Sequence, residues 1–274
     1  MKKIFLFMLC LQAAITTRGQ EAVAVPVNDS LAAPQPTTAA APQQYDELKA
    51  AGDSAYMHND YAAAIERYEA LLKEGESPVL YYNLGNSYYK SDDIARAVLN
   101  YERALLLAPG NADIRANLEI ARAKTVDKVM PVPRIFFVAW TMSLINMLGA
   151  DQWGRVAVVA FFLLLASFCL YLLAKQVRWK KAGFIVMIAC LVVTLLGNLF
   201  AFQQKRKLTE RNDAIVLTPS ATVRSTPSES GTSLFVLHEG RKVEVKDRTM
   251  RNWWEIRLED GKVGWLPAES IEII

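Results

Sequence analysis

Cysteine and histidine are scarce in this chain, with three and two residues among 274. Cys10, Cys169 and Cys190 all lie in apolar segments, so neither a disulfide framework nor a thiolate metal site is expected. His58 and His238 lie far apart, and the chain has no H-E-x-x-H, G-x-S-x-G, G-x-G-x-x-G or Walker lysine motif. We therefore expect no enzyme activity, no cofactor and no bound metal.

A large excess of positive charge is also missing, since the formal net charge is +3. Residues 45–125 and 213–274 are mildly acidic, and the basic residues gather in 126–212. A nucleic-acid-binding surface needs a basic face to neutralise phosphates, so we expect no nucleic-acid partner. The basic residues flank two long apolar segments, where they would meet lipid headgroups.

The N-terminal segment has the pattern of a secretory signal peptide over residues 1–19. A basic start precedes a short apolar run, and the small residues Thr17 and Gly19 stand just before a cleavage point at Gln20. An uncleaved anchor is the alternative, and both interpretations predict that the following domain is exported. Residues 20–44 are rich in Pro and Ala and contain no Lys or Arg, which predicts an extended linker.

Residues 45–125 contain an internal repeat with a spacing of 33 residues. The matching pairs are Gly52 and Gly85, Tyr56 and Tyr89, Asp60 and Asp93, Ala64 and Ala97, and Tyr68 and Tyr101. The second copy resembles the tetratricopeptide (TPR) repeat through Leu84, Gly85, Tyr88, Ala97, Tyr101, Ala104 and Pro109. This resemblance implies antiparallel helix pairs, in which small residues allow a close crossing. Residues 112–124 are amphipathic, so we expect two repeats followed by a capping helix.

Two uncharged segments, residues 156–174 and 182–202, match the length of a membrane-spanning helix. A short basic connection joins them, so they form a hairpin and both flanking domains lie on one side of the membrane. Because the signal peptide exports the first domain, we expect a bacterial inner-membrane protein with both domains in the periplasm. Residues 131–150 are too short an apolar stretch to span. Trp140 favours an interfacial or re-entrant helix there, with a helix buried in a soluble core as the alternative.

Residues 213–274 change to short alternating runs separated by Pro, Gly, Ser and Asp, a pattern typical of a small β-barrel. The order and spacing of these runs resemble bacterial SH3 (SH3b) domains. The matching segments are 221–224 with Pro227, 237–240, 242–245, 253–257, 260–261 and 264–266. The expected fold is therefore multi-domain, with an α-helical TPR repeat module, a two-helix transmembrane hairpin and an all-β SH3-like barrel.

The TPR resemblance implies a concave groove lined by the first helix of each repeat. The partner-binding residues that map to this groove are Lys49, Asp53, Tyr56, Tyr82, Asn86, Tyr89 and Lys90. Some TPR grooves clamp the C-terminal carboxylate of a partner, but Asp53 and Asp113 would repel an anionic terminus, so we do not expect a clamp here. An equally good interpretation of Tyr56 and Tyr89 is that they only pack between helices.

Trp253, Trp254 and Trp265 are more large aromatic residues than the core of so small a barrel needs. Adjacent residues of a strand face opposite sides, so Trp253 and Trp254 cannot both enter one core. We therefore expect these tryptophans to contribute a ligand-binding surface, with packing over an end of the barrel as the alternative.

The order of signal peptide, TPR repeats, two spans and SH3b domain resembles the BatE-like proteins of bacterial aerotolerance (Bat) gene clusters. The resemblance implies a scaffold that acts beside von Willebrand A-domain proteins and a MoxR-type AAA+ ATPase in envelope stress or oxygen tolerance. A protein of another class, which binds or senses peptidoglycan through its SH3b barrel, is the alternative.

Overall fold

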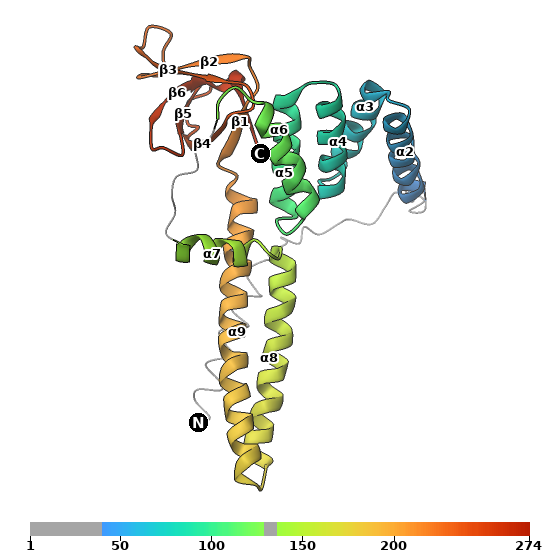
Figure 1. Ribbon diagram of the computed structural model, residues 1–274, viewed down its shortest axis with the longest axis vertical. Coiled ribbons are helices and arrows are strands. Elements are labelled where there is room, and N and C mark those ends of the chain that lie inside the picture. The colour runs from blue at the N-terminus through green and yellow to red at the C-terminus, as the bar shows by residue number, and fades with distance from the viewer. Residues whose placement is uncertain (1–39, 129–135) are drawn as a thin grey trace, which may run out of the picture. The chain divides into compact units, whose positions relative to one another are not determined.

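The computed structural model describes residues 40–128 and 136–274. The predicted signal peptide and most of the predicted linker lie outside the described residues. The described part of the chain begins with five helices (Figure 1): α2 (Ala40–Met57), α3 (Tyr61–Leu72), α4 (Pro78–Lys90), α5 (Ile94–Leu107) and α6 (Ala112–Lys124). Successive helices from α3 to α6 pack against each other, which confirms the helical TPR-like part of the predicted fold.

The turns that precede α3 and α5 have the same structure, as expected from the sequence repeat. Asp60 and Asp93 are the N-cap residues, and each carboxylate accepts a hydrogen bond from the backbone N–H three residues later, at 3.1 and 3.0 Å. Just before each cap, Asn59 and Asp92 have φ angles of 62° and 63°, a left-handed conformation that Asn and Asp tolerate. The same local chemistry therefore sets the entry into the second helix of each repeat.

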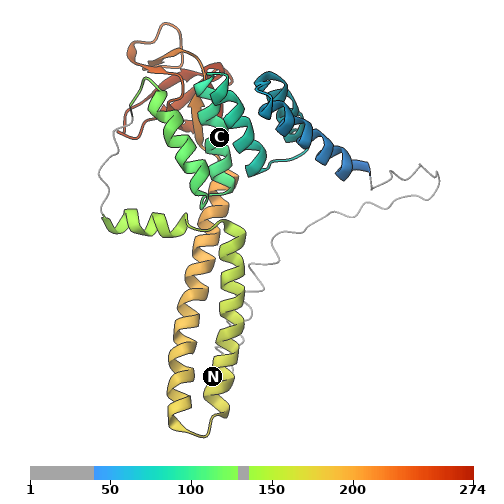
Figure 2. The ribbon, with the colours of Figure 1, turned by 45° about the vertical axis from the view of Figure 1, so that its right-hand side comes forward.

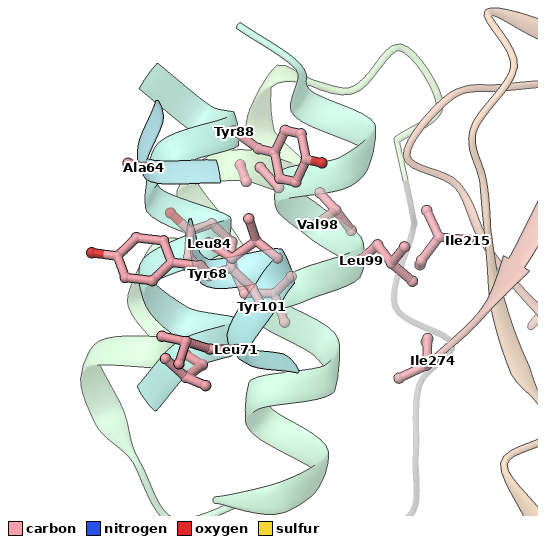
Figure 3. Close-up of a cluster of buried hydrophobic side chains, with 14 residues drawn as sticks. Ala64, Tyr68, Leu71, Leu84, Tyr88, Val98, Leu99, Tyr101, Ile215 and Ile274 are labelled. Carbon is pink, nitrogen blue, oxygen red and sulfur yellow. The ribbon is translucent and has the colours of Figure 1, made fainter. Parts of the chain in front are cut away.

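Tyrosine rings fill the core of the helical repeats. Tyr68 and Tyr101 occupy equivalent places in α3 and α5, and both are buried. Figure 3 shows them in one cluster that also contains Ile215 and Ile274 from the C-terminal part of the chain. The core of the repeats therefore continues into the residues of the β-barrel.

Helices α8 (Ala150–Leu173) and α9 (Val177–Glu210) run side by side, as Figures 1 and 2 both show. Both are long and apolar enough to cross a membrane. At their contact, a Cβ atom on Gly183 would lie 3.1 Å from Ser167 O, and one on Gly197 would lie 3.1 Å from Ala157 Cβ. Small residues thus let the two helices approach closely, as in membrane helix pairs.

Helix α7 (Phe136–Ile145) precedes the hairpin and is shorter than the predicted 131–150 segment, of which 131–135 lies outside the described residues. Its C-terminal end is fixed, because Trp153 Nε1 and Gln204 Nε2 donate hydrogen bonds to Ile145 O at 3.0 and 2.9 Å. Trp153 also packs edge-on against Phe200, with 5.0 Å between the ring centroids. The end of α7 is therefore attached to both α8 and α9.

The C-terminal part is an antiparallel sheet that begins three residues after α9 ends. Its strands are β1 (Asp213–Val216), β2 (Ser220–Arg224), β3 (Ser233–His238), β4 (Lys242–Asp247), β5 (Trp253–Arg257), β6 (Val263–Pro267) and β7 (Ile271–Ile273). Their order in the sheet is β3-β2-β6-β5-β4-β1-β7. The buried core comes from alternate strand positions, with Val223, Val243, Ile256 and Leu266 among its members. This sheet confirms the predicted SH3-like all-β part of the fold.

Candidate functional site

A hollow of about 290 Å³ opens on the face of the helical repeats formed by α2, α4 and α6. Its lining residues are Tyr56, Tyr82, Asn86, Tyr89, Lys90, Tyr101, Asn117 and Ile120. The structure thus brings together five of the residues that the sequence assigns to the groove. They sit on α2 and α4, the first helices of the two repeats.

A hydrogen-bond network at the floor of the groove holds its polar and aromatic side chains in place. Asn86 Oδ1 accepts bonds from Tyr101 Oη at 2.7 Å and from Asn117 Nδ2 at 3.0 Å. Asn117 Nδ2 also lies 2.9 Å from Tyr82 Oη, to which it donates. Because these contacts fix the side chains before any ligand arrives, binding loses less side-chain entropy.

Lys49 and Asp53 lie beside this groove and not within its main hollow. Asp53 faces a second hollow of about 230 Å³, and its carboxylate accepts bonds from Lys49 Nζ and Tyr68 Oη, both at 2.7 Å, and from Asn83 Nδ2 at 3.2 Å. Burial raises the pKa of Asp53, but the hydrogen bonds from Lys49 and Tyr68 outweigh it and hold the pKa below its ordinary value. An ionised Asp53 disfavours an anionic ligand at this end of the groove.

Helix α6 contributes more to the groove than its sequence pattern predicts. Ile120 lines the hollow and is 52% exposed. Lys124 Nζ lies 4.3 Å from the centre of the Tyr89 ring, a cation–π contact on the same side. The sequence identifies α6 as a cap through its buried face, of which Leu118 is a member, and the opposite face gives no comparable signal.

The three tryptophans of the barrel divide between two faces of the sheet. Trp254 packs against the buried cluster with Ile256. Trp253 is half-buried and lies on the other side of β5, together with Glu255. Glu255 is the cross-strand partner of Trp265 in β6, so Trp265 lies on that side as well. The structure therefore groups Trp253 with Trp265 and separates them from Trp254.

Charged side chains border the Trp253–Trp265 face. Arg224 of β2 is the cross-strand partner of Trp265 and therefore lies beside it. Its guanidinium is held by Gly231 O at 3.0 Å and by Glu229 Oε2 at 2.9 Å. Two half-buried tryptophan residues with a fixed hydrogen-bonding group beside them suit a sugar or peptide ligand.

Within residues 40–128 and 136–274, no group of three His, Cys, Asp or Glu side chains is placed to hold a metal ion. His58 Nδ1 lies 2.8 Å from Ser54 O, and His238 Nδ1 lies 2.9 Å from Asp127 Oδ1. Both histidines thus have local partners that account for their positions.

Two family models match the chain. Residues 78–111, which cover α4 and α5, match the tetratricopeptide repeat, and residues 219–272 match the bacterial SH3 domain. No curated protein matches the chain significantly. The chain therefore carries a TPR repeat and a bacterial SH3 domain, two modules that typically bind proteins or cell wall and are typically non-catalytic.

Proposed function

We propose that this protein is a membrane-anchored scaffold that holds an extended segment of a partner protein in the groove between α2, α4 and α6. The observation that carries the proposal is the open aromatic hollow in which Asn86 fixes Tyr101 and Asn117. Tyrosine rings offer large contact areas at a low entropic cost, and amides can pair with a peptide backbone. The ionised Asp53 favours a neutral or basic segment over a free C-terminus.

The helical hairpin would anchor this scaffold, and α7 would lie in the headgroup region beside it. Phe136, Phe137 and Trp140 of α7 are 84%, 61% and 64% exposed, which is unfavourable in water. The end of α7 is bonded to α8 and α9 through Ile145 O, so these rings sit near one end of the spans. Aromatic side chains at that level favour an interfacial position.

We place both modules on the periplasmic side of a bacterial inner membrane, with the α8–α9 connection in the cytoplasm. Residues 174–176 join the two helices, too few to form a domain, so α7 and β1 leave the hairpin on the same side. The module order that resembles BatE-like proteins supports partners with von Willebrand A domains and an AAA+ ATPase system, in aerotolerance or envelope stress.

Peptidoglycan binding is the second candidate function, and the Trp253–Trp265 face favours it. Both side chains are half-buried and share a face with Arg224 and Glu255, so stacking and hydrogen bonding are available together. Sugar rings stack on such aromatic surfaces, and a barrel on the exported side of the membrane would meet the cell wall.

Site-specific photo-crosslinking in living bacteria tests the scaffold function. A photoreactive phenylalanine replaces Ile120 at the groove, or Val79, which is equally exposed at 52% but does not line the hollow. We expect a discrete protein adduct from position 120 that disappears when Tyr89→Ala is added, and none from position 79. Equal adducts from both positions, or none from 120, would count against the scaffold function.

A sedimentation assay separates the second candidate from the first. The full-length protein in nanodiscs is mixed with purified peptidoglycan, and the bound fraction is compared between wild type, Trp265→Ala and Tyr89→Ala. Loss of binding in Trp265→Ala alone would favour the cell-wall function. If the wild-type protein does not sediment with peptidoglycan, the cell-wall function is excluded.

A further inference from the structure

The β-barrel and the helical repeats share an apolar contact centred on α5. Leu99 of α5 belongs to the same buried cluster as Ile215 of β1 and Ile274, the last residue (Figure 3). Ile215 is fully buried and Ile274 is 4% exposed. Two buried side chains of the barrel therefore pack in one apolar cluster with Leu99 of the repeats.

A buried carboxylate lies next to this apolar contact. The Glu102 side chain of α5 is 6% exposed and forms ion pairs with Arg122 of α6 and with Lys242 of β4, the latter at 3.1 Å. Lys242 also pairs with Asp213 of β1 at 2.8 Å. A buried charge is tolerated only when it is paired, and one of the two cations that pair with Glu102 comes from the barrel.

The directions of the pKa shifts agree with this pairing. Burial raises the pKa of Glu102, but the charges of Lys242 and Arg122 outweigh burial and leave the pKa below its ordinary value. Burial lowers the pKa of Lys242, and Glu102 and Asp213 outweigh it in turn, so that pKa is raised. Each partner therefore keeps the other ionised inside the contact.

Two further sets of contacts extend the interface on either side. Arg103 of α5 donates to Glu272 Oε1 at 2.8 Å and to the carbonyl of Ile273 at 2.5 Å. After α6, the Asp127 carboxylate accepts from the backbone N–H of His238 at 2.8 Å. The barrel thus meets the repeats through strands β1, β4 and β7 and through the end of β3.

We infer that the SH3 barrel is the packing partner that completes the short TPR stack, and that the two modules fold and present their binding surfaces as one body. Solenoid repeats bury their cores against neighbours, and two repeats with one cap give few neighbours. The barrel supplies the missing apolar surface and one of the two counter-charges of Glu102. This inference does not depend on which partner the groove binds.

The barrel contacts the repeats through strands other than those that carry Trp253 and Trp265. Strands β4, β1 and β7 stand next to each other at one end of the sheet order, and each contacts α5. Trp253 and Trp265 lie on β5 and β6, farther along that order. The groove is lined by α2, α4 and α6 and by Tyr101 of α5, whereas the barrel contacts other residues of α5, Leu99 and Glu102. Contact with the barrel therefore leaves both the groove and the Trp253–Trp265 face open to ligands.

A designed disulfide tests whether the modules are docked in the membrane-embedded protein. A Cβ atom on Gly240 would lie 3.6 Å from Thr125 Cβ, within the Cβ separation of a disulfide. In full-length protein in nanodiscs, with its three cysteines replaced by alanine, we expect Thr125→Cys with Gly240→Cys to form an intrachain disulfide. The matched pair Thr125→Cys with Ser230→Cys, placed in the β2–β3 loop, should not. Equal cross-linking of both pairs, a disulfide between two chains, or no disulfide in the first pair would contradict the docking.

Hydrogen exchange supplies a second test that does not alter Gly240, whose φ of +78° disfavours any side chain. Lys242→Met removes the counter-charge that the barrel supplies to Glu102 and leaves Arg122 in place, whereas Lys246→Met, on the same strand, removes only the pair with Glu244. We expect amides of α5 to exchange about tenfold faster in Lys242→Met, and unchanged exchange in Lys246→Met. Equal α5 exchange in the two variants would overturn the inference.

Discussion

Gly85 lies so close to Tyr101 that a Cβ atom on the glycine would stand 2.7 Å from Cδ1 of the ring. The same relationship occurs one repeat earlier, where a Cβ on Gly52 would stand 2.9 Å from Cε1 of Tyr68. Both rings are buried, so they have little room to move. The spacing of glycine and tyrosine therefore sets the helix crossing in each repeat.

Replacement of Gly85 by alanine should destabilise the repeat. Overpacking against the Tyr101 ring costs about 1–3 kcal/mol, and the higher helix propensity of alanine offsets about 1 kcal/mol of it. Native-state hydrogen exchange of α4 and α5 measures the change in the free energy of opening. Gly75→Ala is the control, because no atom lies within 4 Å of a Cβ there. A Gly85→Ala variant as stable as Gly75→Ala would contradict the role of the crossing.

The parts of the fold that sequence predicts best are those set by local chemistry. The caps Asp60 and Asp93, the paired glycines and tyrosines and the alternation in the strands all act over a few residues or one repeat. The uncharged segments are equally local signals, because a span depends on length and composition. These features together predict a TPR-like module, two long apolar helices and an SH3-like sheet.

The contacts that sequence does not predict join residues that are distant along the chain. Glu102 looks like an ordinary surface residue of a helix until Lys242, 140 positions later, is placed against it. Strand alternation separates Trp253 from Trp254 but cannot say which of them faces the core. The structure assigns Trp254 to the core, and it adds Ile120 and Lys124 to the groove through the unburied side of α6.

The two adjacent tryptophans of β5 should respond differently to substitution. Trp254→Ala removes a ring packed against the buried cluster and should lower the free energy of unfolding by about 3 kcal/mol. Trp253→Ala should lower the free energy of unfolding less, and it should instead weaken the binding of a ligand at the face shared with Trp265. Denaturant titration followed by near-ultraviolet circular dichroism, together with peptidoglycan sedimentation, separates the two effects. Equal destabilisation by both substitutions would show that the two rings do not divide between core and surface in this way.

The Glu102–Lys242 pair should make the docked modules sensitive to acid and to strong base. The folded pKa of Glu102 is below its ordinary 4.5, so its contribution to stability is present above that value and is lost as pH falls through the folded pKa. The folded pKa of Lys242 is above 10.5, so its contribution is present below 10.5 and is lost as pH rises through the folded pKa.

The double variant Glu102→Leu with Lys242→Met separates the contribution of this ion pair to stability from the contributions of other carboxylates. Asp53 and Glu76 also have lowered pKa values and add acid sensitivity in both proteins. The free energy of unfolding, measured by denaturant titration from about pH 3 to about pH 8, should therefore fall less steeply with acid in the double variant. Parallel curves for the two proteins would show that the pair does not contribute.

Reporter fusions can determine the side of the membrane on which the two modules lie. Arg178 is in the first turn of α9, just after the connection, whereas Ile274 ends the barrel. If the hairpin enters from the periplasm, a fusion after Arg178 should be active only with a cytoplasmic reporter, and a fusion after Ile274 only with a periplasmic one. The basic residues on either side of the spans are too evenly divided to decide this, so the orientation depends on export of the repeat module. The reverse pattern would place the groove and the Trp253–Trp265 face in the cytoplasm, where peptidoglycan is out of reach and only the scaffold function could hold.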